Sequence, residues 1–161
     1  MKKRSVIFVS QGAVIAALYV MLTLLSSAMG LASMPIQIRF SEALTVLSVF
    51  SFAAVPGLFV GCLLSNLLTG AVIWDVIFGS IATLIGAVGT YLLRKHKILP
   101  FLPPIISNTV IVPLVLIYAY ALDGSLAFFA LTVGIGEILS CGVLGALLLK
   151  VLKKHQNYIF K

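Results

Sequence analysis

Ten of the eleven lysine and arginine residues lie in three short clusters that separate long apolar runs. The clusters fall within residues 2–4, 94–97 and 150–161. Basic residues that are confined to the loops and ends of an apolar chain mark the cytoplasmic side of a membrane protein. The pattern therefore predicts a chain that crosses a membrane several times, with all three clusters on the cytoplasmic side. Arg39 stands outside them, three residues before Glu42, and needs a functional explanation.

The composition excludes a soluble domain. The chain of 161 residues is 61% hydrophobic and 9% charged, whereas about a quarter of the residues are charged in a typical soluble domain. We expect one compact membrane domain over residues 1–161. The net charge of +7 comes from the clusters that orient the spans, so we expect membrane lipid and not nucleic acid as its partner.

The apolar runs predict six spans. The first covers residues 5–29 and exceeds the apolar core of a signal peptide, which is about 7–15 residues, so we expect it to be retained. In residues 30–40, Ile36, Ile38 and Phe40 alternate with Gln37 and Arg39, and this segment is predicted to be extended. Ser41 is the predicted N-cap of the second span, with Glu42 in its first turn. Spans two to four are predicted at residues 41–52, 58–68 and 74–93. The fifth span is predicted to end near residue 122 and the sixth at the last basic cluster. The predicted breaks between spans are Pro56-Gly57, a basic loop with Pro100, Pro103 and Pro104, and Asp123-Gly124.

Charge decides whether residues 42–68 form one span or two. Each half is shorter than the roughly 20 residues that a perpendicular helix needs. An even number of spans must separate the first two basic clusters if both face the cytoplasm. We therefore predict two short spans, accommodated by tilt, local thinning of the bilayer or packing near Arg39, and cytoplasmic N- and C-termini.

Glu137 is the strongest candidate for a binding residue. A carboxylate within a span costs about 2.5–3.5 kcal/mol on insertion scales, so it is usually kept for a ligand, a proton or a partner. The alternative is a structural hydrogen bond to a neighbouring span. The flanking residues Gly134 and Gly136 would let a ligand or another backbone approach closely.

Two further acids lie near the ends of spans. Arg39 and Glu42 either bind a ligand or form an interfacial ion pair, which contributes little stability when exposed. Trp74 is either an interface anchor or an aromatic surface on which a planar ligand stacks beside Asp75. Two amides, which could bind a ligand or bridge two spans, complete the candidate set: Asn66 and Asn108.

Small residues form stripes at helical spacing. Gly12 and Ala16 form one register in the first span, and Ala13 and Ala17 form another. A similar stripe runs from Gly57 through Gly61 to Ser65. Such stripes let helices approach closely in lipid and are common in membrane proteins.

No catalytic or metal-binding motif is evident. The sequence lacks a phosphate-binding loop, a nucleophile elbow and a histidine–glutamate metal motif. Cys62 and Cys141 are interpreted as small buried hydrophobic residues, and His96 and His155 have no partners at metal-ligand spacing. We therefore expect no metal, no cofactor in this chain and no enzymatic activity.

Several segments together resemble the QueT family. These are the substrate-binding S-components of energy-coupling factor (ECF) transporters associated with queuosine precursors. The resemblance covers nearly the whole chain and rests on residues 35–47, 56–66, 74–84, 103–108 and 134–139.

The resemblance implies an all-α fold, a six-helix transmembrane bundle of the S-component type in a bacterial cell membrane. It also implies a cavity near the extracellular side, a transmembrane coupling subunit and two cytoplasmic ATPases that use ATP. The stripe of Ala13 and Ala17 matches the alanine motif by which S-components dock onto the coupling subunit, with Gly12 and Ala16 as a second possible register.

The implied substrate is a 7-deazaguanine base. Its guanine-like edge presents adjacent N–H donors, which a carboxylate accepts together. Glu137 is the first choice for that carboxylate and Asp75 the second, and a cationic aminomethyl precursor would suit a surplus acid better than a neutral nitrile. An S-component for another vitamin and a self-sufficient proton-coupled carrier remain alternatives. The other expected ligand contacts are stacking on Trp74, amide hydrogen bonds from Asn66 and Asn108, and the Arg39–Glu42 pair at the entrance.

Overall fold

A computed structural model of the protein describes residues 2–31 and 36–159, and they are folded into helices joined by short connections. Two of the short helices, η1 and η2, are 3-10 helices, and η3 is a π-helical stretch that joins α5 to α6. The elements are α1 (Lys2–Ala28), η1 (Phe40–Val49), α2 (Ala54–Leu68), α3 (Ile73–Leu92), η2 (Leu99–Phe101), α4 (Leu102–Tyr118), α5 (Leu126–Glu137), η3 (Ile138–Leu144) and α6 (Gly145–Ile159).

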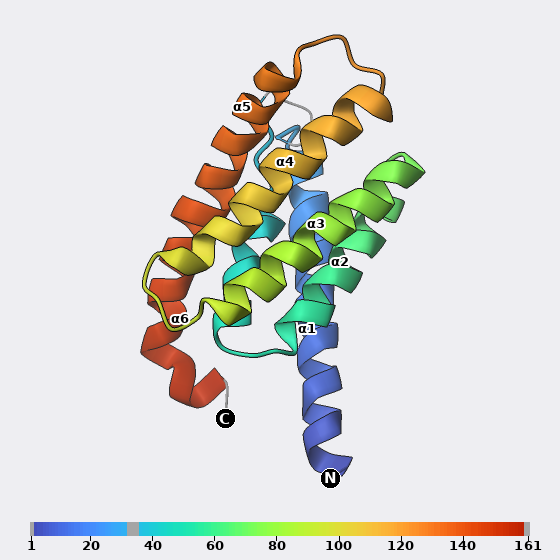
Figure 1. Ribbon diagram of the computed structural model, residues 1–161. Coiled ribbons are helices and arrows are strands. Elements are labelled where there is room, and N and C mark those ends of the chain that lie inside the picture. The colour runs from blue at the N-terminus through green and yellow to red at the C-terminus, as the bar shows by residue number, and fades with distance from the viewer. Residues whose placement is uncertain (1, 32–35, 160–161) are drawn as a thin grey trace.

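The chain runs along the bundle six times, through α1, η1, α2, α3, α4 and the continuous α5–η3–α6 segment (Figure 1). Both ends of the chain and the α3–α4 connection lie at the same end of the molecule, so the three basic clusters gather there (Figure 1). The predicted six-helix bundle is confirmed, while its orientation in the membrane stays a prediction. Four segments are long and apolar enough to cross a membrane: Arg4–Ala28, Ile73–Leu92, Leu99–Tyr118 and Leu126–Lys154.

The short helix η1 lies in the centre of the bundle. Its residues from Ser41 to Ser48 are all buried, and it contacts α1, α2, α3 and α6. A 3-10 helix rises about 2.0 Å per residue, so ten residues reach about 20 Å, compared with about 15 Å in an α-helix. The stretched helix geometry therefore helps a short segment to traverse the bundle, and the surrounding helices shield its backbone from lipid.

Close packing joins α1 to α2 through small residues. A Cβ atom added to Gly57 would lie 2.6 Å from the backbone oxygen of Gly12, and one added to Gly61 would lie 3.0 Å from the backbone oxygen of Ala16. Neither glycine tolerates a side chain without movement of one helix. The stripes on α1 and α2 therefore form an internal helix–helix interface of the kind that small residues permit in membranes.

Only one of the two small-residue stripes of α1 takes part in the contact with α2. Ala16 is buried against α2 and Gly12 lies against the α2 backbone, whereas Ala13 and Ala17 are exposed. The register of Gly12 and Ala16 is thus packed against α2 within the protein, and its part in docking a partner stays a prediction. The register of Ala13 and Ala17 remains open.

The start of η1 differs from the sequence-based expectation. The helix begins at Phe40, with Arg39 as an extended N-cap residue that makes no side-chain cap. Ser41, the predicted N-cap, lies inside the helix, where its Oγ accepts a hydrogen bond of 2.8 Å from the Thr23 hydroxyl on α1. The N-cap prediction was wrong because the Ser41 hydroxyl is hydrogen-bonded to Thr23 on α1 and does not cap η1.

The predicted break at Pro56-Gly57 was also wrong. Pro56 lies in the first turn of α2, which begins at Ala54. A proline is tolerated there because the backbone N–H groups of a first helical turn have no intrahelical partner. The same holds for Pro103 at the start of α4, which ends at Tyr118, four residues before the predicted end.

The connection between α1 and η1 packs tightly against α5. Of the segment predicted to be extended, residues 32–35 lie outside the described residues, and residues 36–39 are non-helical. A Cβ atom added to Gly136 would lie 2.1 Å from the carbonyl oxygen of Gln37, whereas one added to Gly134 would meet Thr109 at 3.4 Å, an ordinary contact. Gly136 therefore permits the close backbone approach that its sequence context predicted.

These two glycines provide a matched pair of variants. We expect Gly136→Ala to lower the melting temperature in detergent, because the added methyl group displaces the Gln37 backbone, and such overpacking costs about 1–3 kcal/mol. Gly134→Ala should be neutral or stabilising, because alanine has a higher helix propensity by about 1 kcal/mol. Equal melting temperatures for the two variants would contradict the packing of Gln37 on α5.

The orientation in the membrane can be tested by cysteine labelling. Cys62 and Cys141 are buried, so single cysteines introduced at exposed positions should dominate the signal. His96→Cys, in the α3–α4 connection, should react only with reagents that reach the cytoplasm, and Asp123→Cys, in the α4–α5 connection, should react from outside the cell. Labelling of position 96 from outside would invert the proposed orientation.

Candidate functional site

Three of the four acids in the chain point into the protein. Glu42 is 2%, Asp75 6% and Glu137 8% exposed, whereas Asp123 is exposed. The three acids come from different elements, η1, α3 and the end of α5. Because buried carboxylates are costly unless they are paired or hydrogen-bonded, their partners define the site.

Glu42 is held by two helices. The Tyr19 hydroxyl on α1 donates a hydrogen bond to Oε1 of Glu42, and Nδ2 of Asn108 on α4 approaches Oε2 at 3.5 Å. Both carboxylate oxygens therefore already face a donor from the protein. Asn108 was predicted as a ligand contact, and Tyr19 was missed because it occupies an ordinary apolar position of the first span.

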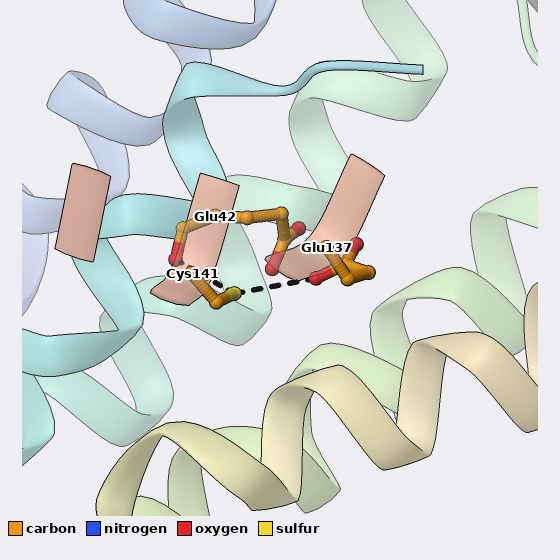
Figure 2. A group of neighbouring side chains, drawn as sticks. All are labelled: Glu42, Glu137 and Cys141. Atoms are coloured by element: carbon orange, nitrogen blue, oxygen red, sulfur yellow. Dashed lines mark hydrogen bonds between the residues drawn. The ribbon is translucent and has the colours of Figure 1, made fainter. Parts of the chain in front are cut away.

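Glu137 lies at the point where α5 passes into the π-helical stretch η3. Its Oε2 accepts a hydrogen bond of 3.2 Å from Sγ of Cys141, which is also 3.4 Å from the backbone oxygen of Glu42 (Figure 2). π-Helical turns occur frequently at functional sites. The interpretation of Cys141 as a mere hydrophobic residue missed this contact, although its spacing of four residues from Glu137 was a signal for it.

The cluster formed by Glu42, Glu137 and Cys141 presents two carboxylate oxygens and a sulfur within 4.8 Å of one another (Figure 2). Such a set could ligate a metal ion. However, Tyr19 and Asn108 face the Glu42 oxygens, and the Cys141 thiol donates to Glu137. The arrangement is therefore better suited to a hydrogen-bonding ligand than to a cation held by thiolate and carboxylates.

Arg39 lies at the entrance of η1 and is half-buried. Its backbone N–H donates to the Ser140 hydroxyl at 3.2 Å. Within the described residues its guanidinium is not within 4.0 Å of a carboxylate, so the predicted ion pair with Glu42 is not formed. Burial alone would lower the pKa of Arg39, but the charge of Asp75 and other nearby groups raises it overall, so this side chain is a cation.

A small polar cavity lies between η1, α3, α4 and α5. The space inside this central cavity is about 20 Å³, enough for about one water molecule. Both Glu42 and Glu137 line it. The full set is Gln37, Arg39, Glu42, Gly79, Thr83, Asn108, Val112, Val133 and Glu137.

A second, larger polar cavity lies towards the α2–α3 turn, and its space is about 260 Å³. Asp75 lines this rim cavity, where its Oδ2 accepts a hydrogen bond of 3.0 Å from the Tyr120 hydroxyl. Burial and the Asp75 charge raise the pKa of Tyr120, which keeps this hydroxyl a donor. The full lining set, which shares Arg39 with the central cavity, is Thr23, Ser27, Arg39, Asn66, Thr69, Gly70, Ala71, Asp75 and Tyr120.

The structure thus brings six of the seven predicted ligand contacts to two adjoining cavities and leaves Trp74 apart. Trp74 is 53% exposed, stacks on Phe78 with ring centroids 6.0 Å apart, and lines an apolar groove between α3 and α4. It lines neither polar cavity, so its predicted stacking on the ligand gains no support. Sequence reasoning also missed lining residues without an individual signal, namely Gln37, Gly79 and Thr83.

Comparison with known proteins agrees with these features. Residues 9–154 match the family described as QueT transporter. The queuosine precursor transporter QueT of Lactococcus lactis subsp. cremoris (strain MG1363) is 35% identical over 98 residues, which cover 60% of this chain and 57% of that protein. The matched region thus spans little more than half the length of that relative. No solved structure gives a significant match.

The family match covers most of the chain and agrees with the apolar six-helix bundle around a polar cavity. The chain is therefore a membrane protein that belongs to the QueT transporter family.

Proposed function

We propose that this chain is the substrate-binding subunit of an ECF-type importer in a bacterial cell membrane, and that it takes up a 7-deazaguanine precursor of queuosine. The central cavity carries this proposal, because it places two buried carboxylates, an arginine and two amides inside the bundle. Intramembrane polar groups of this kind mark substrate pathways. The name of the Lactococcus relative supports the class of substrate.

The polar groups of the central cavity suit the edge of a guanine-like base. Cys141 donates to Oε2 of Glu137, and the amide of Asn108 also lies beside this carboxylate, whose second oxygen is Oε1. That oxygen can accept from the ring N–H and the amino group of the base. Gln37 and Asn108 supply amides for the carbonyl and the remaining edge groups.

The central cavity must enlarge to admit a base. Arg39 is a wall of both the central and the rim cavity, and its guanidinium is free of ion pairs with the described carboxylates. Rotation of this side chain would break no ion pair with a described carboxylate, and it would join the two cavities into one site. A ligand that enters through the rim cavity would then reach Glu137 without movement of a helix.

The proposed energy source is a partner that hydrolyses ATP. The chain has no phosphate-binding loop, and α1 is the least buried of its four long spans. Ala13 and Ala17 lie on the exposed face of this helix, where small residues allow close approach by another helix. We infer that a transmembrane coupling subunit docks here and links the chain to two cytoplasmic ATPases.

Replacement of Glu137 by glutamine tests the ligand site. The amide retains the shape but turns a donor towards the donors of the base, which leaves a buried group unpaired at about 1–3 kcal/mol. We expect affinity for queuine or the aminomethyl precursor to fall by about ten-fold to a few hundred-fold in calorimetric titration. Asp123→Asn, at an exposed acid, is the control and should bind normally.

Unchanged affinity in a folded Glu137→Gln variant would reduce this residue to a structural role. A wild-type protein that binds another vitamin but no deazaguanine would refute the proposed substrate while leaving an S-component role intact.

A bulky residue in the open register of α1 tests the coupling. We expect Ala17→Trp to abolish uptake by cells, because it blocks close helix approach, and to leave the affinity of the isolated chain for its ligand unchanged. Leu131→Trp, at an exposed position of α5, is the matched control and should retain uptake. Full uptake by the purified chain in liposomes without ATP would instead indicate a self-sufficient carrier.

A further inference from the structure

One end of the bundle carries cations without acidic side chains to balance them. Both chain ends and the α3–α4 connection lie there, whereas Asp123 belongs to the connection at the opposite end (Figure 1). The other three acids, Glu42, Asp75 and Glu137, line the two cavities. In the described part of the chain, no side chain of this basic end lies within 4.0 Å of a carboxylate. Its exposed cations are Arg4, Arg94, Lys95, Lys97, Lys150, Lys153 and Lys154.

The cations of the α3–α4 connection project from a segment that is held at both ends. At its start, the Arg94 guanidinium lies 3.9 Å from the centroid of the Tyr91 ring, and its Nη1 donates a hydrogen bond of 3.1 Å to the Tyr91 carbonyl. At its far end, the buried Thr90 hydroxyl donates a hydrogen bond of 2.7 Å to the carbonyl of Pro100. Side chains on such a segment can bind an anion with little further ordering of the backbone.

The lysines of α6 face outwards beside this connection. Leu149 is buried and Leu152 packs against the core, which turns residues 150, 153 and 154 away from the bundle. A Cβ atom added to Gly145 would lie 3.6 Å from Cε1 of Phe101 in η2, and Figure 1 shows the connection passing alongside α6. The two segments therefore adjoin and present their cations together.

Exposed apolar side chains lie among these cations. Leu92 is 70% and Ile98 73% exposed, on either side of the basic residues 94–97. Tyr91, which precedes them, also contacts Phe52 with ring centroids 5.0 Å apart, and tyrosine is typical of the boundary between membrane and water. Apolar groups beside cations suit that boundary, because the apolar groups enter the acyl region while the cations reach the phosphates.

We propose that the basic end binds anionic phospholipids of the surrounding leaflet, and that the α3–α4 connection and α6 form the main contact with their phosphate groups. Clusters of lysine and arginine next to a span attract anionic lipids, and the planar fork of Arg94 matches a phosphate. The start of α1, with Arg4, lies apart from α6 at the same end (Figure 1). A leaflet reaches all of these cations together, whereas an acidic protein docked on one side would leave some of them uncovered.

Native mass spectrometry of the purified full-length chain in detergent tests this surface. The probe is an equimolar mixture of phosphatidylglycerol, which carries a net negative charge, and phosphatidylcholine, which carries none, with identical acyl chains. We expect bound phosphatidylglycerol to exceed bound phosphatidylcholine by at least about tenfold at low ionic strength, because each basic side chain near the head groups favours the anionic lipid. The excess should shrink as the salt rises from about 0.1 M to about 1 M, since the Debye length falls from about 10 Å to about 3 Å.

Equal binding of the two lipids at low salt would overturn the proposal and leave an acidic protein surface as the partner of these cations. Inorganic phosphate at the concentration of the lipid should not displace phosphatidylglycerol, because it lacks the acyl chains that Leu92 and Ile98 contact at the boundary. Displacement by phosphate would indicate a site for the free ion and would also overturn the assignment to lipid.

Two variants locate the contact. Replacing Lys95, Lys97, Lys153 and Lys154 together by glutamine should lower the ratio of the two bound lipids by at least about threefold, because four charges near the phosphates are lost. Replacing the same four lysines by arginine keeps the charge and should preserve the ratio. An unchanged ratio in the glutamine variant would refute the assignment to these segments, and the salt dependence of the wild-type chain remains decisive if that variant does not fold.

Discussion

A carboxylate inside an apolar bundle must find its hydrogen-bond donors within the protein, because lipid supplies none. Glu42 meets this constraint at the centre of the molecule, on a short helix that is surrounded by the others. Its two donors, Tyr19 and Asn108, come from helices that are far apart in the sequence. The relative positions of α1, η1 and α4 are thereby tied to one side chain, and the walls of the central cavity depend on them.

The architecture follows from signals that are local in the sequence. The basic clusters and the apolar runs were enough to predict that the chain traverses the bundle six times. The requirement for an even number of spans between the first two basic clusters correctly divided residues 42–68 into two helices. The errors at Ser41 and Pro56 have a different origin. The hydrogen-bond partner of Ser41 lies on another helix and depends on tertiary packing. The position of Pro56 in a first turn depends on the residue at which α2 begins. Acids were good candidates for the site because an apolar chain keeps few of them.

The site was less predictable than the fold, because neighbours in sequence need not face the same way. Successive residues of a helix point about 100° apart, so Asp75 faces a polar cavity while Trp74 faces an apolar groove. Arg39 and Glu42 are close in sequence, yet the oxygens of Glu42 face Tyr19 and Asn108 instead. Residues such as Gln37 and Gly79 carry no distinct signal of their own and join the site only through long-range packing.

The two small-residue stripes on α1 are offset by one residue, so this helix has two faces with different surroundings. One face is locked to α2 through Gly12 and Ala16 and ends at Tyr19, whose hydroxyl reaches Glu42. The other register, about 100° around the helix, presents Ala13 and Ala17 outwards. Because Gly12 and Ala16 pack against the α2 backbone, α1 cannot turn about its axis without displacing Tyr19 from Glu42.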